Sequence, residues 1–299
     1  MRPLPPLLLA ALLASPAAAQ SVWTIAPPAA VVPLGTFQDT TLSEASAAAA
    51  SRDQPGVIWT LNDSGNPPWL YAVDTAGATL GIFRVAGAGN FDWETLTLGP
   101  CPAGTCVIVG DIGDNPETRP SVTLYRVPEP RITSASASEL GATAPADSLR
   151  LTYPDGPHDV EAIYANAAGD LYLVSKGRTK GILLFRLPAS AWDGGGVATP
   201  EFIDSLPIKP DISIGQWVSD AALSPDGTRV AVRTYSAVFF FVVGADGRLT
   251  PDHGRECFFG AIEPQGEGIT WLDDRRLLLT SESSATSRGT LTLLDCGQP

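Results

Sequence analysis

Residues 161–176 read EAIYANAAGDLYLVSK, and this stretch sets a pattern that recurs along the chain. An acidic residue, Glu161, is followed by an apolar run, a turn at Ala167–Asp170 and a second apolar run, Leu171–Val174, that ends beside Lys176. Two β-rich runs on either side of a turn that contains glycine are typical of a β-hairpin. We therefore interpret the stretch as the first two strands of a repeated unit.

The same pattern occurs five times, and successive acids are 47 to 67 residues apart. A third β-rich run follows each hairpin, and a fourth often follows the third. Four-stranded units of this length are typical of β-propeller blades, so we predict an all-β propeller with five blades. Six blades are possible if the region from Glu129 to Asp147 contains strands, but its Ser, Ala and Pro content favours a surface loop. A β-sandwich is the rival architecture.

The last repeat has only three β-rich runs before the C-terminus. The N-terminal segment Trp23–Leu34 is predicted to supply its missing outer strand. Pairing the two ends of the chain in one blade would close the ring and remove an open sheet edge.

The N-terminus predicts export. Met1-Arg2-Pro3 precedes a short apolar run, Leu4–Leu13, and a stretch of small residues that ends at Gln20, which is the layout of a cleavable signal peptide. We predict a signal peptide at residues 1–19, a single propeller domain at residues 20–299, and a secreted or periplasmic protein. An uncleaved anchor is the alternative. No later apolar run is long enough to span a bilayer, and a formal net charge of −13 argues against nucleic-acid binding.

Four cysteines in an exported chain predict disulfides, with three pairings possible. Cys101 and Cys106 flank a turn, so we expect them to pair locally. Cys257 and Cys296 would then tie down the C-terminus. The spacings do not fit a zinc site.

The repeated acids are predicted to meet. In a propeller blade the start of the first strand and the end of the second lie on the same face. One mouth would therefore collect Glu44, Glu94, Glu161, Asp220 and Glu267. Beside them we expect Asn62, Asp63, Asp111, Lys176, Arg233 and Glu282, with the loop residues Asp92, Asp114, Asn115, His158, Asp159 and Tyr235 at the rim.

Converging carboxylates repel one another unless they take up protons, pair with bases or bind a cation. Lys176 and Arg233 are too few to balance the acids, and oxygen ligands suit a hard cation, so we favour Ca²⁺. The predicted ligands are Glu44, Asn62, Glu94, Asp111, Glu161, Asp220 and Glu267. The alternative is that the acids cap strand ends and the two bases are structural partners.

Common catalytic motifs are missing, including Gly-x-Ser-x-Gly and His-Glu-x-x-His. The predicted catalytic residues are His158 as a general acid or base, with Lys176 and Arg233 binding an anionic group.

Four segments carry a resemblance to a largely uncharacterised group of secreted bacterial propeller proteins. They are Asp92-Trp93-Glu94, Gly110-Asp111-Ile112-Gly113-Asp114-Asn115, Arg126–Pro130 and His158–Ala162. More distantly, the chain resembles phytase-like esterases, SdiA-regulated proteins and calcium-dependent gluconolactonases. That resemblance implies a calcium ion at the channel mouth, with Glu44, Asn62, Glu94, Asp111, Glu161 and Glu267 as ligands. Those enzymes usually have six blades, whereas five repeats are visible in this chain.

Two functions follow from this pattern. The first is a cation-dependent hydrolase of a phosphate ester or a lactone. The second is a non-catalytic propeller that binds a small anionic molecule or an envelope protein, with Trp69, Trp93 and Trp217 as contact residues. In either case we expect a monomer without a membrane span.

Overall fold

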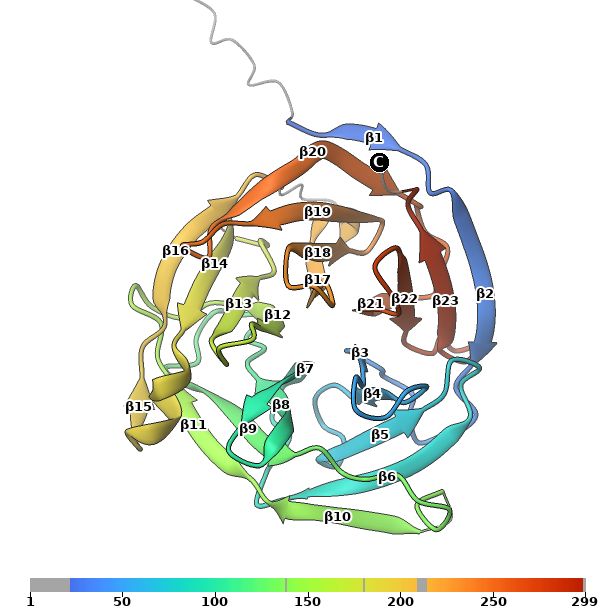
Figure 1. Cartoon of the computed structure of the whole chain (residues 1–299), viewed down its shortest axis with the longest axis vertical. Helices are drawn as coiled ribbons and strands as arrows, with labels where there is room; N and C mark the ends of the chain where they lie inside the picture. Colours follow the sequence, from blue (N-terminus) through green and yellow to red (C-terminus); the bar gives the residue numbers. More distant parts are fainter. Residues whose placement is uncertain (1–21, 138, 180, 209–213, 298–299) are drawn as a thin grey trace, which may run out of the picture.

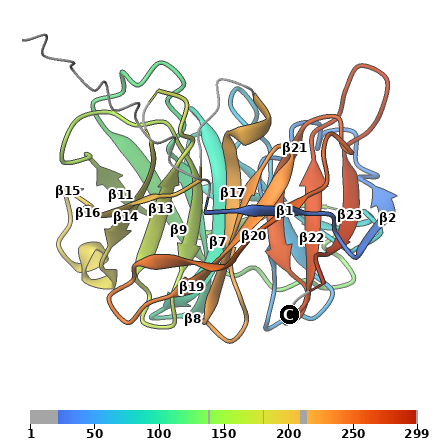
Figure 2. The same ribbon diagram turned by 90° about the horizontal axis from the view of Figure 1, so that it is seen from above.

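The chain folds as five β-sheets arranged in a ring, which confirms the predicted all-β propeller with five blades (Figure 1). The computed structural model describes residues 22–137, 139–179, 181–208 and 214–297. The predicted signal peptide, residues 1–19, lies outside the described residues. Seen from the side, the strands run between two layers of loops (Figure 2).

Each blade contains four antiparallel strands. Blade 1 comprises β3 (Ala49–Ala50), β4 (Ile58–Leu61), β5 (Trp69–Val73) and β6 (Thr79–Ala86), and blade 2 comprises β7 (Trp93–Cys101), β8 (Gly104–Asp111), β9 (Val122–Pro128) and β11 (Asp147–Leu151). Blade 3 comprises β12 (Val160–Ala165), β13 (Leu171–Ser175), β14 (Ile182–Leu187) and β16 (Glu201–Leu206), and blade 4 comprises β17 (Val218–Leu223), β18 (Arg229–Thr234), β19 (Ala237–Val243) and β20 (Leu249–Phe258). Blade 5 comprises β21 (Gly266–Trp271), β22 (Arg276–Ser281), β23 (Thr290–Asp295) and β2 (Ala30–Thr36). Two short 3₁₀ turns, Ala189–Asp193 and Ile214–Gln216, lie in connections.

The ring closes through the N-terminal strand, as predicted, because β2 pairs antiparallel with β23. The segment predicted as one strand is two. β1 (Thr24–Ala26) pairs parallel with β20 of blade 4, and only β2 joins blade 5. Pro27 and Pro28 stand between them, and proline lacks the N–H that a continuous strand would use.

Two other blades also carry a fifth, parallel strand on their outer edge. β10 (Leu140–Pro145) pairs with β6, and β15 (Val197–Ala198) pairs with β11. The prediction of a surface loop from Glu129 to Asp147 was therefore wrong for Leu140–Pro145. The strand adds no sixth blade, because it covers the exposed edge of blade 1, which is a common protection against edge-to-edge association.

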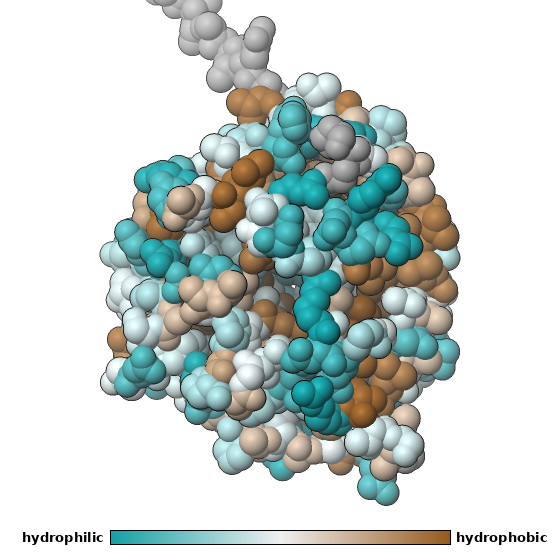
Figure 3. All heavy atoms as spheres, in the orientation of Figure 1, coloured by the Kyte–Doolittle hydropathy of each residue, from teal (hydrophilic) through white to brown (hydrophobic). Residues whose placement is uncertain are grey.

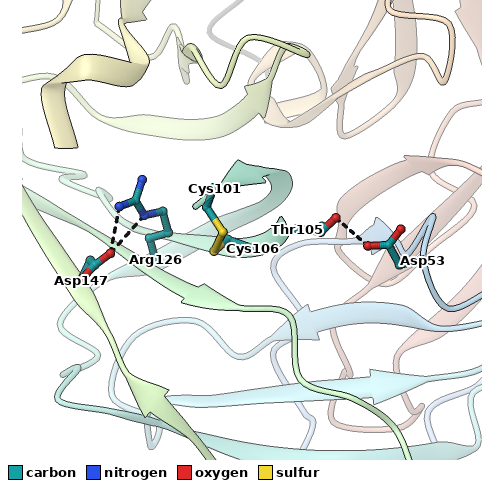
Figure 4. Close-up of a disulfide and its surroundings, with 6 residues drawn as sticks. All are labelled: Asp53, Cys101, Thr105, Cys106, Arg126 and Asp147. Carbon is teal, nitrogen blue, oxygen red and sulfur yellow. Dashed lines mark hydrogen bonds and ion pairs between the residues drawn. A yellow bond between two sulfur atoms is a disulfide. The ribbon is translucent and has the colours of Figure 1, made fainter. Parts of the chain in front are cut away.

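Both predicted disulfides are present. Cys101 of β7 and Cys106 of β8 bond to each other beside the turn of the β7–β8 hairpin (Figure 4). Cys257 of β20 and Cys296, which follows β23, connect blade 4 to blade 5. The second bond therefore ties down the C-terminus at the place where the ring closes.

The hydrophobic core is divided among the blade junctions. Five clusters of buried side chains are found, one at each contact between neighbouring blades. Trp59 of β4 and Trp93 of β7 are both fully buried in the cluster between blades 1 and 2. Trp93 is therefore a core residue and does not contribute to a binding rim.

A buried hydrogen-bond network joins the blades at the axis. Asp220 of β17 accepts from the backbone N–H of Ile269 in blade 5 at 2.8 Å and from the Thr95 hydroxyl in blade 2 at 3.3 Å. Thr95 Oγ1 in turn accepts from the N–H of Ile163 in blade 3, and the N–H of Ala48 in blade 1 also donates to Asp220. These groups are all buried. The network therefore ties the first strands of all five blades to one another.

The end of the ring where the first and second strands are joined by hairpins has a hollow of about 410 Å³ lined mostly by small residues. Figure 3, in the orientation of Figure 1, shows hydrophilic side chains extending across the middle of the molecule.

Candidate functional site

Six carboxylates gather at one end of the ring within the described part of the chain. They lie at the starts of first strands or just after the ends of second strands, as the repeat predicts. The loop from β22 to β23, which begins beside one of them, rises from this side in Figure 2. The six are Asp63, Asp92, Glu94, Glu161, Glu267 and Glu282, and we call them the acidic mouth.

Three of these acids are close enough to share one cation. Oxygens of Asp63, Asp92 and Glu94 all lie within 4.8 Å of one another. Burial raises the pKa of Glu94 well above its ordinary value, and the charges of Glu161 and Asp63 raise it further. Burial and then the Asp63 charge raise the pKa of Asp92 to about 6. The carboxylates thus repel one another in a place where water screens them poorly.

The loop before β7 is held in shape by specific bonds. Asn90 donates to the carbonyl of Asp63 at 2.8 Å and accepts from the N–H of Trp93, which links blade 1 to blade 2. Asp111 accepts from the N–H groups of Phe91 and Asp92 and pairs with Arg119 at 2.7 Å. Both Asp111 oxygens are therefore used to position the loop.

Gly113, in the Gly-Asp-Ile-Gly-Asp-Asn segment, lies directly against two of the clustered acids. A methyl group at this position would lie 2.4 Å from Glu94 Oε1 and 2.6 Å from Asp92 Oδ2. No side chain fits there unless the two carboxylates move. The absence of a side chain at Gly113 thus makes room for two of the three clustered acids.

The mouth has one buried base among the described residues. Lys176, which follows β13, forms an ion pair with Glu161 at 2.6 Å, and both side chains are buried. Burial alone would lower the pKa of Lys176, but Glu161 and the neighbouring acids raise it above its usual value, so it stays protonated. For Glu161, burial raises the pKa by more than the charge of Lys176 lowers it, and the pKa of Glu161 is therefore raised to about 8.

Blade 5 contributes a second pair of acids. Gln265 Nε2 donates to Glu267 and to Glu282 at 2.9 Å each. Burial raises the pKa of Glu267 to about 7, and burial together with the Glu267 charge raises the pKa of Glu282 to about 8. The Tyr235 hydroxyl, from blade 4, hydrogen-bonds to Glu267. Glu267 and Glu282 can therefore hold or release protons near neutral pH.

Three of the predicted ligands, Asn62, Asp111 and Asp220, bond to groups of the fold, and a fourth, Glu44, lies outside the cluster. Asn62 accepts from the N–H of Glu44 and donates to the carbonyl of Thr41 at 2.6 Å. Asp220 belongs to the axial network. Glu44 lies at the rim, where it is exposed and accepts from Asn66.

Two of the predicted catalytic residues are also occupied elsewhere. Arg233 has no exposed surface; it donates to the carbonyls of Gly268 and Thr280 and pairs with Glu263. His158 is 1 % exposed and bonds to Asp155 at 2.7 Å. Lys176 alone of the three reaches the acidic mouth.

Asp63, Asp92 and Glu282 were expected near the mouth but not as ligands, and Gln265 was not predicted at all. The Asp-Trp-Glu segment could have indicated Asp92, because its spacing places two acids on the same strand end. Nothing in the sequence marks Gln265, because its role depends on a contact between two loops of blade 5.

Of the aromatic residues predicted as contacts, Trp69 is partly buried and packs against the core between blades 1 and 5. The ring of Trp217 is half-buried beneath Arg178, whose guanidinium is 4.5 Å from the ring centre. Phe91 is 69 % exposed and carries Arg119 over its ring at 4.6 Å. A continuous aromatic rim does not form among the described residues.

Comparison with known proteins shows the fold and leaves the function open. No family profile matches the chain, and no curated protein sequence does. A PQQ-bound aldose sugar dehydrogenase from Streptomyces coelicolor superposes with a TM-score of 0.51 and 14% identity, over 90% of this chain and 99% of that one. A gluconolactonase from Xanthomonas campestris gives a TM-score of 0.47 and 10% identity, over 90% and 98%. The first likeness shows a shared propeller fold alone, and the second is too distant to add to it.

The described residues contain no helix long and apolar enough to cross a membrane.

Proposed function

We propose that this protein is a calcium-dependent hydrolase that opens a lactone ring at the acidic mouth. The observation that carries the proposal is the cluster of Asp63, Asp92 and Glu94, whose oxygens lie within 4.8 Å of one another. Hard cations prefer carboxylate oxygens, and calcium accepts irregular arrangements of them.

The residues fit such an ion. The three acids repel one another, and Glu94 is almost completely buried. The absence of a side chain at Gly113 leaves space for the carboxylates of Glu94 and Asp92. Asp63, Asp92 and Glu94 would hold the ion. When bound, calcium would supply a Lewis acid that polarises a carbonyl group.

The charge of the mouth favours a neutral substrate. The mouth has six carboxyl groups, several of them partly protonated at neutral pH, and one ammonium group, and Arg233, which could have bound a phosphate, is buried and bonded to Gly268, Thr280 and Glu263. A phosphate ester would bring further negative charge to this surface, whereas a lactone brings none. We therefore prefer the lactone to the phosphate ester.

The remaining residues of the mouth have defined roles in this proposal. Lys176 stays protonated and donates to Glu161, so it can also stabilise negative charge that develops on a substrate oxygen. Glu267, whose pKa is about 7, accepts a proton from the water that adds to the lactone carbonyl and returns it to the ring oxygen as the ring C–O bond breaks. Tyr235 and Gln265 fix the orientation of Glu267, and Gln265 also holds Glu282.

We also propose that the protein acts outside the cytoplasm. Two disulfides, Cys101–Cys106 and Cys257–Cys296, are expected to persist only in an oxidising compartment. This agrees with the export signal expected from the N-terminal sequence.

The test is hydrolysis by the full chain after removal of metal with EDTA. A panel of γ- and δ-lactones and p-nitrophenyl phosphate is assayed with and without added Ca²⁺. We expect lactone hydrolysis that requires Ca²⁺ and falls at least about 100-fold in Glu94→Gln, but not in the exposed control Glu139→Gln. Calcium binding without hydrolysis of any substrate would instead favour a non-catalytic binding propeller.

A further inference from the structure

A second group of polar side chains lies at the junction of blades 2 and 3, on the blade 3 side of the three clustered acids, and its Asp159 charge acts on Asp92. Asp114 follows β8, Asp159 precedes β12, and Tyr153 follows β11. The backbone N–H of Asp114 donates to Asp159 Oδ1 at 3.0 Å, so these two residues are adjacent. Asp114 is 1 % exposed and Asp159 is 2 % exposed.

Each of these side chains has a buried oxygen without a hydrogen-bond partner within the described ranges. Asp114 Oδ2 accepts from the N–H of Arg119 at 2.6 Å, which leaves Oδ1 free. Asp159 Oδ2 and the Tyr153 hydroxyl also have no partner. Native proteins rarely leave such groups unsatisfied, because a buried oxygen without a donor has lost its bonds to water without replacement.

Tyr153 is an independent sign of a ligand. The side chain is 9 % exposed, and its ring packs edge-on against His158, the neighbour of Asp159, with ring centres 5.3 Å apart. Burial raises the pKa of this phenol, and the charges of Asp159 and Asp114 act in the same direction. The ring contact with His158 and the bond from Asp114 to Asp159 thus bring Tyr153 to the same junction as both carboxylates.

The charge of the group is also unbalanced. Neither Asp114 nor Asp159 forms an ion pair with a described residue. The nearby guanidinium of Arg119 is already bonded to Asp111 and to the carbonyl of Gly113. The charge of Asp159 also acts on Lys176, but that ammonium is paired with Glu161. Two buried carboxylates without a cation of their own are costly. A water molecule could satisfy hydrogen bonds but could not balance two negative charges.

We propose that Asp114, Asp159 and Tyr153 bind a second cation, Ca²⁺, which joins the loop after β8 to the start of β12. All three donors are oxygens, which suits a hard ion, and their irregular arrangement suits calcium better than magnesium. The site is structural and does not depend on the proposed hydrolase activity. The site gives a role to Asp114 and Asp159, the acids of the Gly-Asp-Ile-Gly-Asp-Asn and His-Asp-Val-Glu segments that have no role in the acidic mouth.

The experiment counts calcium ions per chain by equilibrium dialysis of the EDTA-treated full chain. We expect two ions in the natural protein and one in Asp63→Asn/Glu94→Gln, which lacks the mouth cluster. Asp114→Asn/Asp159→Asn should also bind one. A mouth variant that binds no calcium would overturn the second site, whatever the outcome for the hydrolase.

A second measurement avoids the risk that the double variant at the junction fails to fold. In Asp63→Asn/Glu94→Gln, a hundredfold excess of Ca²⁺ over its Kd should raise the Tm by about 5 °C, because the remaining ion binds only the folded state. Tyr153→Phe in the same background should weaken this rise. An unchanged Tm on addition of Ca²⁺ would rule out the junction site.

Discussion

Glu94→Gln should make the metal-free protein more stable at high pH while it abolishes calcium binding at the mouth. In the folded protein the pKa of Glu94 is raised well above its ordinary value of 4.5. The folded state therefore keeps a proton that the unfolded state releases as the pH rises. That stability is fully present below the unfolded pKa and is lost as the pH rises through the folded pKa. Glutamine cannot ionise, so Glu94→Gln does not lose this stability as the pH rises.

The magnitude follows from the geometry. Unit charges 4.8 Å apart interact by about 3 kcal/mol at an effective dielectric constant of 20, and by about 1 kcal/mol in water. Asp63 and Asp92 are half-buried, so each repulsion lies between these limits. By linkage, one extra proton in the folded state changes the free energy of unfolding by at most about 1.4 kcal/mol per pH unit. Between pH 5 and pH 8, we expect the free energy of unfolding of Glu94→Gln to rise by about 2 kcal/mol relative to that of the natural protein.

The assay is urea unfolding in EDTA at pH 5, 6.5 and 8, with Glu139→Gln as an exposed control. The difference in the free energy of unfolding between Glu94→Gln and the natural protein should grow with pH, and the control should follow the natural protein. Addition of Ca²⁺ at pH 8 should stabilise the natural protein more than the variant. Parallel pH dependences for the variant and the natural protein would refute the reasoning.

Three further predictions test the surrounding structure. Asp220→Ala should lower the free energy of unfolding by about 3–6 kcal/mol in urea titrations, because the buried donors of Thr95, Ile269 and Ala48 lose their acceptor. Asp220→Asn should lower it less, and equal losses for the two variants would argue against the network. Gly113→Ala should lower calcium affinity at the mouth at least about 10-fold by calorimetry, whereas Gly194→Ala, in an open loop, should not. Calcium affinity should rise with pH through about 6, where Asp92 loses its proton; an affinity that is flat from pH 5 to pH 8 would contradict the ligand assignment.

Much of the fold could be predicted from the sequence, because each hairpin has local signals. The turn at Ala167–Asp170 and its flanking β-rich runs correspond to β12 and β13. The outer strands β10 and β15 were not predicted. They are short and contain alanine, glycine and proline, and they pair in parallel with a neighbouring blade. Such pairing depends on tertiary contacts and leaves no alternation in the sequence.

The site could be predicted only in part. The repeat correctly places acids such as Glu94 and Glu161 at one end of the ring, because strand geometry fixes where each strand begins. It does not distinguish an acid that faces the mouth from one that bonds to backbone groups, as Asp111 and Asp220 do. Arg233 shows the same limit, since its position at a strand end did not reveal that Glu263 would pair with it.

The most direct measurement is a crystal structure of the full chain soaked in Tb³⁺, a hard cation that replaces calcium and scatters anomalously. Our account predicts an anomalous peak bonded to oxygens of Asp63, Asp92 and Glu94. A well-ordered mouth with these three side chains visible and no peak between them would contradict it.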